Sequence, residues 1–251
     1  MEKEKIIQVN NLVKSFDGKT VISGISFSLY SGEHLVVLGK SGSGKSVIMK
    51  CIVRLLEADE GSINVFGTDI GKCSENELAG IRHRIGYLFQ EGALYDSMNI
   101  LENLLFPARR NPKLQKLPDK ELKQLAEMNL ESVGLQDAIH KMPAELSGGM
   151  KKRAGLARTL MLSPEMIIYD EPTTGLDPFT SDAINNLIIK VRKGYNTSAI
   201  IITHDIWCAE KTGDRLLILH EGKIIGDGTF YELKNHPDRE VRLFFKNHTT
   251  P

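Results

Sequence analysis

The residues with the clearest chemical pattern form a glycine-rich stretch that ends in lysine and serine. This stretch is Gly39, Lys40, Ser41, Gly42, Ser43, Gly44, Lys45 and Ser46. It fits the phosphate-binding pattern G-x-x-x-x-G-K-[ST] without a mismatch. In such a loop, backbone N–H groups at a helix N-terminus face an anion, the lysine reaches the β- and γ-phosphates, and the next hydroxyl binds Mg²⁺. We therefore predict a nucleoside triphosphate site; the alternative is an ordinary Gly/Ser-rich turn.

The segments on either side must place this loop where a strand turns into a helix. Leu35 to Leu38 is an apolar run that predicts a buried strand, and Val47 to Leu56 predicts a helix. This is the context that the phosphate-binding pattern requires.

Two neighbouring carboxylates provide a second candidate for chemistry. Asp170 and Glu171 follow the short apolar strand predicted for Met166 to Tyr169. In phosphoryl transfer, one carboxylate helps to hold Mg²⁺ and another group orients or activates the attacking water. The pair resembles a Walker B element, with Glu171 as the candidate general base. The alternative is a polar pair that only caps a helix.

Bulk properties limit the class of protein. The chain has 251 residues, long enough for one large α/β domain or two small ones. Lys+Arg and Asp+Glu both number 32, so the formal net charge is zero, and we expect no nucleic-acid partner. The three cysteines show no disulfide or metal spacing and are expected to be structural. Because no apolar run is long enough to cross a bilayer, we expect a soluble intracellular chain whose membrane role comes through a partner.

The predicted fold class is α/β, in a single domain over residues 1–251, because no linker suggests two independent domains. Residues 1–90 and 164–235 are expected to form the core, residues 91–163 a helical subdomain, and residues 236–251 a C-terminal tail. Ile6 to Phe16 and Val21 to Tyr30 predict two antiparallel strands. We also expect Ser74 to open a helix through a capping box, Asp119 and Ser147 to cap later helices, and Gly194 to close another.

One motif between the two candidate sites identifies the family. Leu146-Ser147-Gly148-Gly149 reads LSGG, with Gln90 before it and His204 after Asp170. This combination resembles the ABC-type ATPases. The resemblance covers Ile6 to about Leu233 and implies a P-loop NTPase core with an antiparallel β layer and an inserted helical subdomain. It implies ATP and Mg²⁺ as cofactors.

The resemblance also implies a role for each motif residue. Phe16 would stack on adenine, and Gln90, Ser46 and Asp170 would lie near Mg²⁺. Catalytic roles fall to Glu171, His204, Gln90 and Lys45. Taken alone, Phe16 would be read as a core residue and His204 as a structural histidine.

A second copy of the chain is implied as well. Ser147, Gly148 and Gly149 would bind the γ-phosphate held by another subunit's P-loop, and Asp177 belongs to the D-loop Gly175-Leu176-Asp177. The expected assembly is a head-to-tail homodimer with ATP between its subunits.

Finer features resemble the ATPases of the Mla/Mce lipid-transport systems. These features are the form LSGGM-K-K-R, with Met150 where many family members have glutamine, Glu102-Asn103 with Phe106-Pro107, and the tail 238–245. They imply that the chain is held at the cytoplasmic face of the cell membrane through an integral-membrane permease. They also imply a regulatory subunit, a lipid-binding Mce-type protein and phospholipid cargo. The tail has the alternative of an amphipathic helix that packs on its own domain.

Two other functions remain open. One is the ATPase of a small-metabolite importer, which would share the chemistry and differ in its partner. The other is an ATP-gated clamp on DNA or ribosomes, although the chain has a single ATPase domain and no sustained heptads between Ser46 and Ser147.

An apolar stretch follows Gln90. It contains Leu94, Tyr95, Met98, Leu101, Leu104, Leu105 and Phe106. We expect it to receive a segment of the permease; the alternative is that it packs within the helical subdomain.

Overall fold

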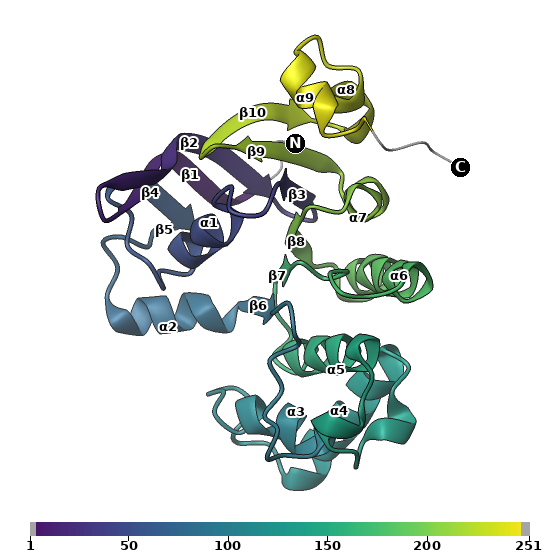
Figure 1. The fold of residues 1–251 in the computed structure, drawn as a ribbon. Helices are drawn as coiled ribbons and strands as arrows, with labels where there is room; N and C mark the ends of the chain where they lie inside the picture. Colours follow the sequence, from purple (N-terminus) through teal and green to yellow (C-terminus); the bar gives the residue numbers. More distant parts are fainter. Residues whose placement is uncertain (1–3, 247–251) are drawn as a thin grey trace. The chain divides into compact units, whose positions relative to one another are not determined.

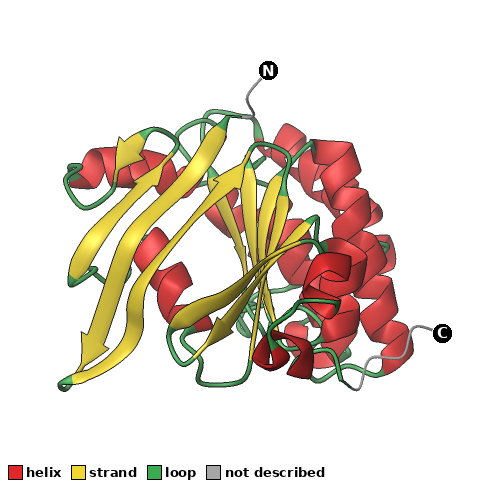
Figure 2. Cartoon of the chain, turned by 90° about the horizontal axis from the view of Figure 1, so that it is seen from above, coloured by secondary structure: helices red, strands yellow, loops and turns green. Residues whose placement is uncertain are grey.

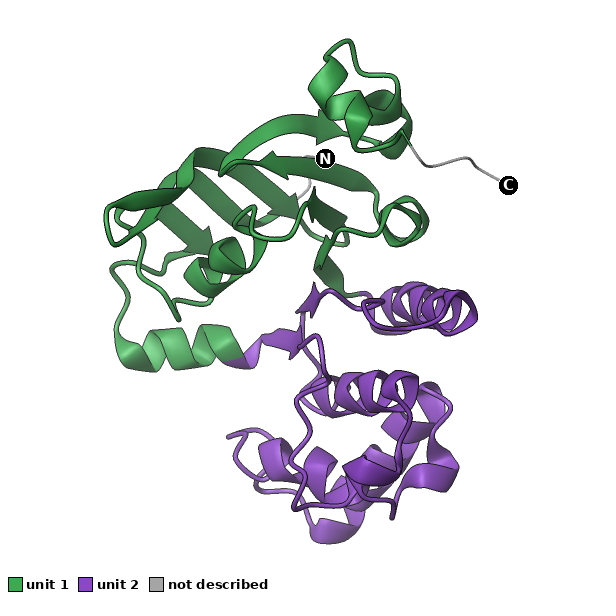
Figure 3. Ribbon diagram, viewed as in Figure 1, with its two compact units in different colours: residues 1–82, 197–251 green, residues 83–196 purple. Residues whose placement is uncertain are grey.

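The computed structural model describes residues 4–246, which divide into two units (Figure 1, Figure 3). The first contains residues up to 82 and from 197 onward, and the second contains residues 83–196. These boundaries differ from the ends predicted for the helical subdomain, residues 91 and 163, and the subdomain stays a prediction.

The first unit is built on two groups of strands (Figure 2). One is an antiparallel sheet in the order β2-β1-β4-β5. Its strands are β1 (Lys5–Phe16), β2 (Lys19–Tyr30), β4 (Glu60–Val65) and β5 (Thr68–Asp69). The expected antiparallel pairing of β1 with β2 is confirmed, with Val9 opposite Phe27.

The other group places β3 (His34–Gly39) between two parallel neighbours. These are β8 (Ser198–Thr203) and β9 (Arg215–His220), and β10 (Lys223–Gly228) pairs antiparallel with β9. All residues of β3 and β8 are buried. Burial on both faces explains why these strands appear in the sequence as continuous apolar runs.

The remaining elements of the first unit are helices. They are α1 (Lys45–Ile52), α2 (Glu75–His83), whose last residue belongs to the second unit, α7 (Ile206–Thr212), α8 (Phe230–Lys234) and α9 (Arg239–Leu243). Helix α1 ends before the predicted Leu56 because Arg54 has a left-handed φ of 50°.

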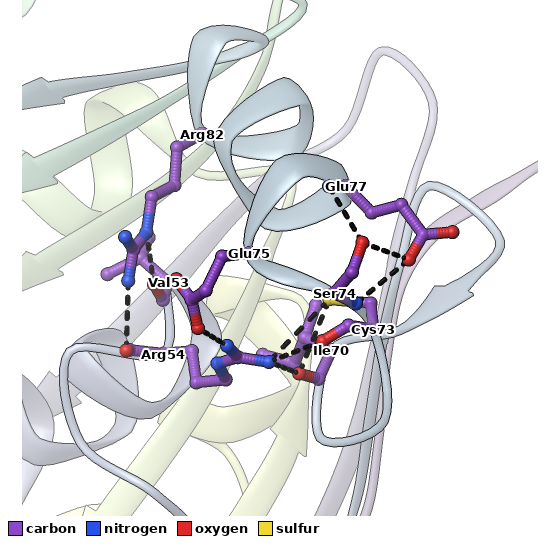
Figure 4. Close-up of polar contacts among 8 residues, drawn as sticks. All are labelled: Val53, Arg54, Ile70, Cys73, Ser74, Glu75, Glu77 and Arg82. Atoms are coloured by element: carbon purple, nitrogen blue, oxygen red, sulfur yellow. Dashed lines mark hydrogen bonds and ion pairs between the residues drawn. The ribbon is translucent and has the colours of Figure 1, made fainter.

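The start of α2 matches the sequence prediction. Ser74 and Glu77 form the expected capping box: the Ser74 N–H donates to the Glu77 carboxylate at 2.8 Å, and the Glu77 N–H donates to Ser74 Oγ at 3.3 Å. Arg54 donates to two backbone carbonyls of the loop before α2 at 2.8 and 2.9 Å. Arg82 donates to two carbonyls after α1, both at 2.9 Å (Figure 4).

The tail packs within the first unit as far as the structure describes it. Val241 and Phe245 are buried, and the Phe245 ring lies edge-on to Phe230 with centroids 5.3 Å apart. The alternative, a tail helix that packs on its own domain, therefore holds for α9 and for Phe245 after it. Residues 247–251 lie outside the described part of the chain.

The second unit combines a parallel strand pair with helices. Its elements are β6 (Ile85–Leu88), α3 (Ile100–Ala108), α4 (Asp119–Ser132), the 3-10 turns Gln136–Ala138 and Pro143–Glu145, α5 (Gly148–Leu160), β7 (Met166–Asp170) and α6 (Pro178–Tyr195). Strand β6 pairs with β7, and α3, α4 and α5 pack on one another.

Two helix ends differ from the predictions. Asp119 is not an N-cap: Pro118 occupies that position without a side-chain cap, and Asp119 lies in the first turn, 3.1 Å from Arg109. There its charge favours the helix dipole. Helix α6 passes Gly194 and ends where Asn196 adopts a left-handed φ of 49°, which asparagine tolerates.

Candidate active site

The phosphate-binding loop lies between β3 and α1, as predicted. The Lys45 ammonium is buried and donates to the carbonyls of Gly39 at 2.7 Å and Lys40 at 3.0 Å. Gly44 has a φ of 105°, and a Cβ there would lie 2.5 Å from Ile22 Cδ1. The buried Ser43 hydroxyl has no hydrogen-bond partner among the described residues. A curled backbone, a lysine and an unsatisfied hydroxyl fit a phosphate.

Two further predicted residues lie in the same unit. His204 directly follows β8, whose Thr203 is opposite Leu38 at the end of β3, so this exposed histidine and the loop leave the same edge of the sheet. Phe16 ends β1 with 39% of its surface exposed. The alternative of a core phenylalanine is wrong, because the ring is accessible for stacking.

Asp170 and Glu171 lie in the second unit, at and after the end of β7. Tyr87 of β6 donates from its hydroxyl to Asp170 Oδ2 at 2.9 Å. Burial raises the pKa of Tyr87, and the Asp170 charge raises it further. Glu171 has a left-handed φ of 49°, and Thr174 donates to its Oε2 at 3.1 Å. Non-glycine residues rarely adopt this backbone conformation, so its surroundings must hold it in place.

The residue that holds this loop was missed by sequence reasoning. Lys152 of α5 is buried, and its ammonium donates to the carbonyls of Glu171 at 3.2 Å, Pro172 at 2.9 Å and Thr174 at 2.7 Å. An ammonium has three N–H donors, and three carbonyls accept here. The sequence shows only a lysine in a basic run, which predicts a solvated side chain, so no local signal identifies this role.

The LSGG motif begins α5, as predicted. Ser147 caps the helix by accepting from the Met150 N–H at 3.3 Å. A Cβ at Gly149 would lie 2.4 Å from Thr180 Cγ2 of α6, so this close approach requires glycine. Asp177 caps α6 through the Thr180 N–H at 3.0 Å, and the hydrogen bonds from Thr180 lower the pKa of Asp177. The signature and D-loop motifs therefore open two helices that touch.

A cavity of about 480 Å³ brings three of the motifs together within the second unit. Gln90, Gly148 and Gly175 line it, together with Lys151 and Lys152. The Q-loop, the signature helix and the D-loop thus share one hollow.

A second hollow, which we call the aromatic cavity, has a volume of about 590 Å³. Its lining includes Tyr87, Phe89, Tyr95, Phe106 and Arg158. Phe106 lies against Tyr95, with ring centroids 4.8 Å apart.

The aromatic cavity divides the apolar stretch after Gln90. Tyr95 is 44% exposed, whereas Leu104 and Leu105 are buried. The expectation of a surface patch is therefore wrong for these two leucines, which pack within the second unit. The part of the stretch that lines the cavity is Tyr95 and Phe106.

Each of the residues predicted near the metal carries an oxygen donor. Ser46 carries a hydroxyl, Gln90 an amide oxygen and Asp170 a carboxylate. Oxygen ligands of this kind suit Mg²⁺. Ser46 belongs to the first unit, and Gln90 and Asp170 belong to the second.

These features define a class of protein, the P-loop nucleoside triphosphatases. The family follows from comparison with known proteins: the family model described as "ABC transporter" matches residues 22–174. The chain belongs to the ABC transporter family and is one of its ATPases.

Curated relatives and solved structures agree with this assignment. "Probable ribonucleotide transport ATP-binding protein mkl" of Mycobacterium tuberculosis is 39% identical over 95% of this chain, which spans 66% of that protein's length. "Intermembrane phospholipid transport system ATP-binding protein MlaF" of Haemophilus influenzae is 35% identical over 97% of this chain and 91% of its own length. A solved dimeric ATP-binding cassette, in a post-hydrolysis state with ADP and Pi, is 27% identical, with a TM-score of 0.78 over 89% of this chain and 98% of that one.

Proposed function

We propose that this chain is the ATPase subunit of a transporter that moves phospholipid or a related lipid through a separate membrane permease. The observation that carries the proposal is the match to the phospholipid-transport protein MlaF, which extends over 91% of that protein. The form LSGGM-K-K-R at residues 146–153 supports it. Within residues 4–246, no helix has both the length and the apolar character of a membrane span. We infer a peripheral position at the cytoplasmic face, held through the permease.

The proposed chemistry is ATP hydrolysis, with roles assigned to individual residues. Phe16 stacks on the adenine, and Lys45 together with the backbone of Gly39 to Ser46 binds the phosphates. Ser46, Gln90 and Asp170 would hold Mg²⁺, which neutralises charge on the β- and γ-phosphates when bound.

Glu171 accepts a proton from the attacking water, and Lys152 keeps the Glu171 loop in its left-handed conformation. His204 donates to the γ-phosphate, stabilising charge as it develops there.

We further propose that the working unit is a head-to-tail homodimer. Ser147, Gly148 and Gly149 begin a helix of thirteen residues, and helix N-termini favour anions. In the proposed dimer, this end faces the γ-phosphate bound by the partner's loop. The dimeric state of the similar ADP-bound cassette supports this arrangement.

We propose that the aromatic cavity receives the permease. Tyr95→Asp places a charge in an apolar wall, so the variant should lose its integral-membrane partner during co-purification. Met128→Asp is the matched control, since Met128 is 65% exposed and does not line this cavity. Both variants should melt like the wild type. If Tyr95→Asp retains the same permease as the control, the docking surface lies elsewhere.

A second candidate function is transport of a small metabolite, which the name of the mycobacterial ribonucleotide-transport relative favours. The deciding experiment is purification of the tagged chain from native membranes, followed by mass spectrometry of co-purified proteins and extracted small molecules. Phospholipid enriched with the permease, together with a regulatory subunit or an Mce-type protein, supports lipid transport. A soluble substrate-binding protein without enriched lipid supports the importer.

A further inference from the structure

Tyr87 contacts two functional regions of the second unit at once. Its hydroxyl donates to Asp170 Oδ2 at 2.9 Å, while the residue lines the aromatic cavity beside Phe89, with ring centroids 4.2 Å apart. We propose that Tyr87 is a positioning residue that orients the Mg²⁺-binding carboxylate of Asp170 and makes that orientation sensitive to what fills the aromatic cavity. The part that concerns the cavity rests on the proposed permease docking.

The strand register explains how one side chain reaches the carboxylate. In the parallel pair, Tyr87 of β6 is opposite Ile168 of β7. Side chains alternate between the faces of a sheet, so Asp170, two residues after Ile168, lies on the same face as Tyr87. The long phenol side chain therefore reaches forward to the carboxylate at the strand end.

Helix α5 fixes the backbone that carries this tyrosine. The Thr159 hydroxyl of α5 lies within hydrogen-bonding distance of two carbonyls, that of Gly155 in its own helix at 2.9 Å and that of Tyr87 at 3.3 Å. At the preceding residue, Gly86, a Cβ would lie 2.4 Å from Thr159 Cγ2, so helix and strand are in close contact. Because the backbone is held from this side, the adjustable part of Tyr87 is its side chain, and the residue lines the cavity.

The hydroxyl matters because a metal-binding carboxylate must be held in one orientation. A hydrogen bond to an ionised carboxylate is stronger than one between neutral groups. Residues that orient metal ligands in this way typically contribute about 10- to 100-fold in metal affinity or activity. A segment that enters the aromatic cavity would press on the tyrosine ring and so alter the hold on Asp170.

The neighbouring tyrosine provides a matched control. Tyr169 is fully buried in β7, next to Asp170, and its hydroxyl has no hydrogen-bond partner among the described residues. Tyr87→Phe removes a hydroxyl that holds the carboxylate, and Tyr169→Phe removes one that holds nothing.

The first experiment measures metal binding on the isolated full chain. Mn²⁺ is titrated into each protein at a concentration where all added ADP is bound, and free Mn²⁺ is read from its electron paramagnetic resonance signal. We expect Tyr87→Phe to bind Mn²⁺ about 10-fold more weakly and Tyr169→Phe to match the wild type. ADP affinity in EDTA should be unchanged in both. Wild-type Mn²⁺ affinity in Tyr87→Phe, or an equal loss of ADP affinity in EDTA, would overturn the positioning role.

The second experiment compares the isolated chain with the chain purified in complex with its permease. The Mg²⁺ concentration for half-maximal hydrolysis should differ between the two states in the wild type and in Tyr169→Phe, and the difference should disappear in Tyr87→Phe. A difference that survives in Tyr87→Phe, or none in the wild type, would overturn the link to the cavity. The Mn²⁺ result needs no permease, so it separates failure of the positioning role from failure of the proposed docking.

Discussion

The phosphate-binding loop and the loop after β7 are stabilised in different ways. The first is stabilised by residues close to it in the sequence. Lys45 donates to carbonyls five and six residues before it, and the positive φ at position 44 is accommodated by a glycine. The second carries Glu171 in a left-handed conformation and depends on Lys152, which is 19 residues away. The phosphate cradle is thus encoded locally, whereas the position of the proposed general base depends on tertiary packing.

The largest expected effect comes from Glu171, the first residue of the second loop. Glu171→Gln preserves shape but removes the group that accepts a proton from water, so ATP turnover should fall by orders of magnitude while ATP still binds. The measurement is phosphate release beside equilibrium ATP binding. Undiminished phosphate release would exclude Glu171 as the general base.

A smaller effect should follow from loosening that loop without touching the carboxylate. Lys152→Met removes the three hydrogen bonds to carbonyls, and misplacement of a catalytic group by about 1 Å can cost on the order of 10²-fold in rate. We expect kcat to fall by up to that factor while ATP affinity stays within about twofold.

The control for this experiment is Lys123→Met in α4, an exposed lysine that lines neither cavity, and this variant should hydrolyse ATP like the wild type. Thermal melting of both variants checks that each is folded. Equal rates in the two variants would mean that the buried lysine does not position Glu171.

The smallest effect concerns stability. Asp177→Asn keeps an N-capping side chain but removes the charge. The pKa of Asp177 is lowered in the folded state by its hydrogen bonds from Thr180, so its charge stabilises the fold above the unfolded-state pKa, and this stabilisation is lost as pH falls through the folded-state pKa. The urea midpoint of the wild type should therefore fall slightly more than that of Asp177→Asn between about pH 6 and about pH 3. An equal shift of the urea midpoint with pH in the two proteins would show that the Asp177 charge does not contribute to stability.

Features governed by nearby sequence were predictable. The strand–loop–helix context of Lys45, the antiparallel pair β1–β2, the capping box at Ser74 and the cap at Ser147 all follow from residue type and short spacing. The cap at Asp119 failed because the preceding proline supplied the non-helical residue, which moved the aspartate into the first turn.

Features governed by distant packing were not predictable. Lys152 and Tyr87 act through contacts 19 and 83 residues away, and neither has a local pattern that distinguishes it from an ordinary lysine or strand tyrosine. The exposure of Phe16 at the end of β1 and the burial of Leu104 in α3 depend on packing in the same way.

The central claim is that the signature of one copy completes the phosphate site of another, and mixing two inactive variants tests it most directly. Lys45→Ala removes the phosphate clamp, and Ser147→Arg blocks the anion site at the start of α5. A mixed head-to-tail dimer carries both lesions in one site and keeps the other intact. Random mixing should restore up to roughly a quarter of the wild-type ATPase rate, because half of the dimers are mixed and each has one intact site. No recovery, although mixed dimers are captured through two different tags, would contradict the composite site.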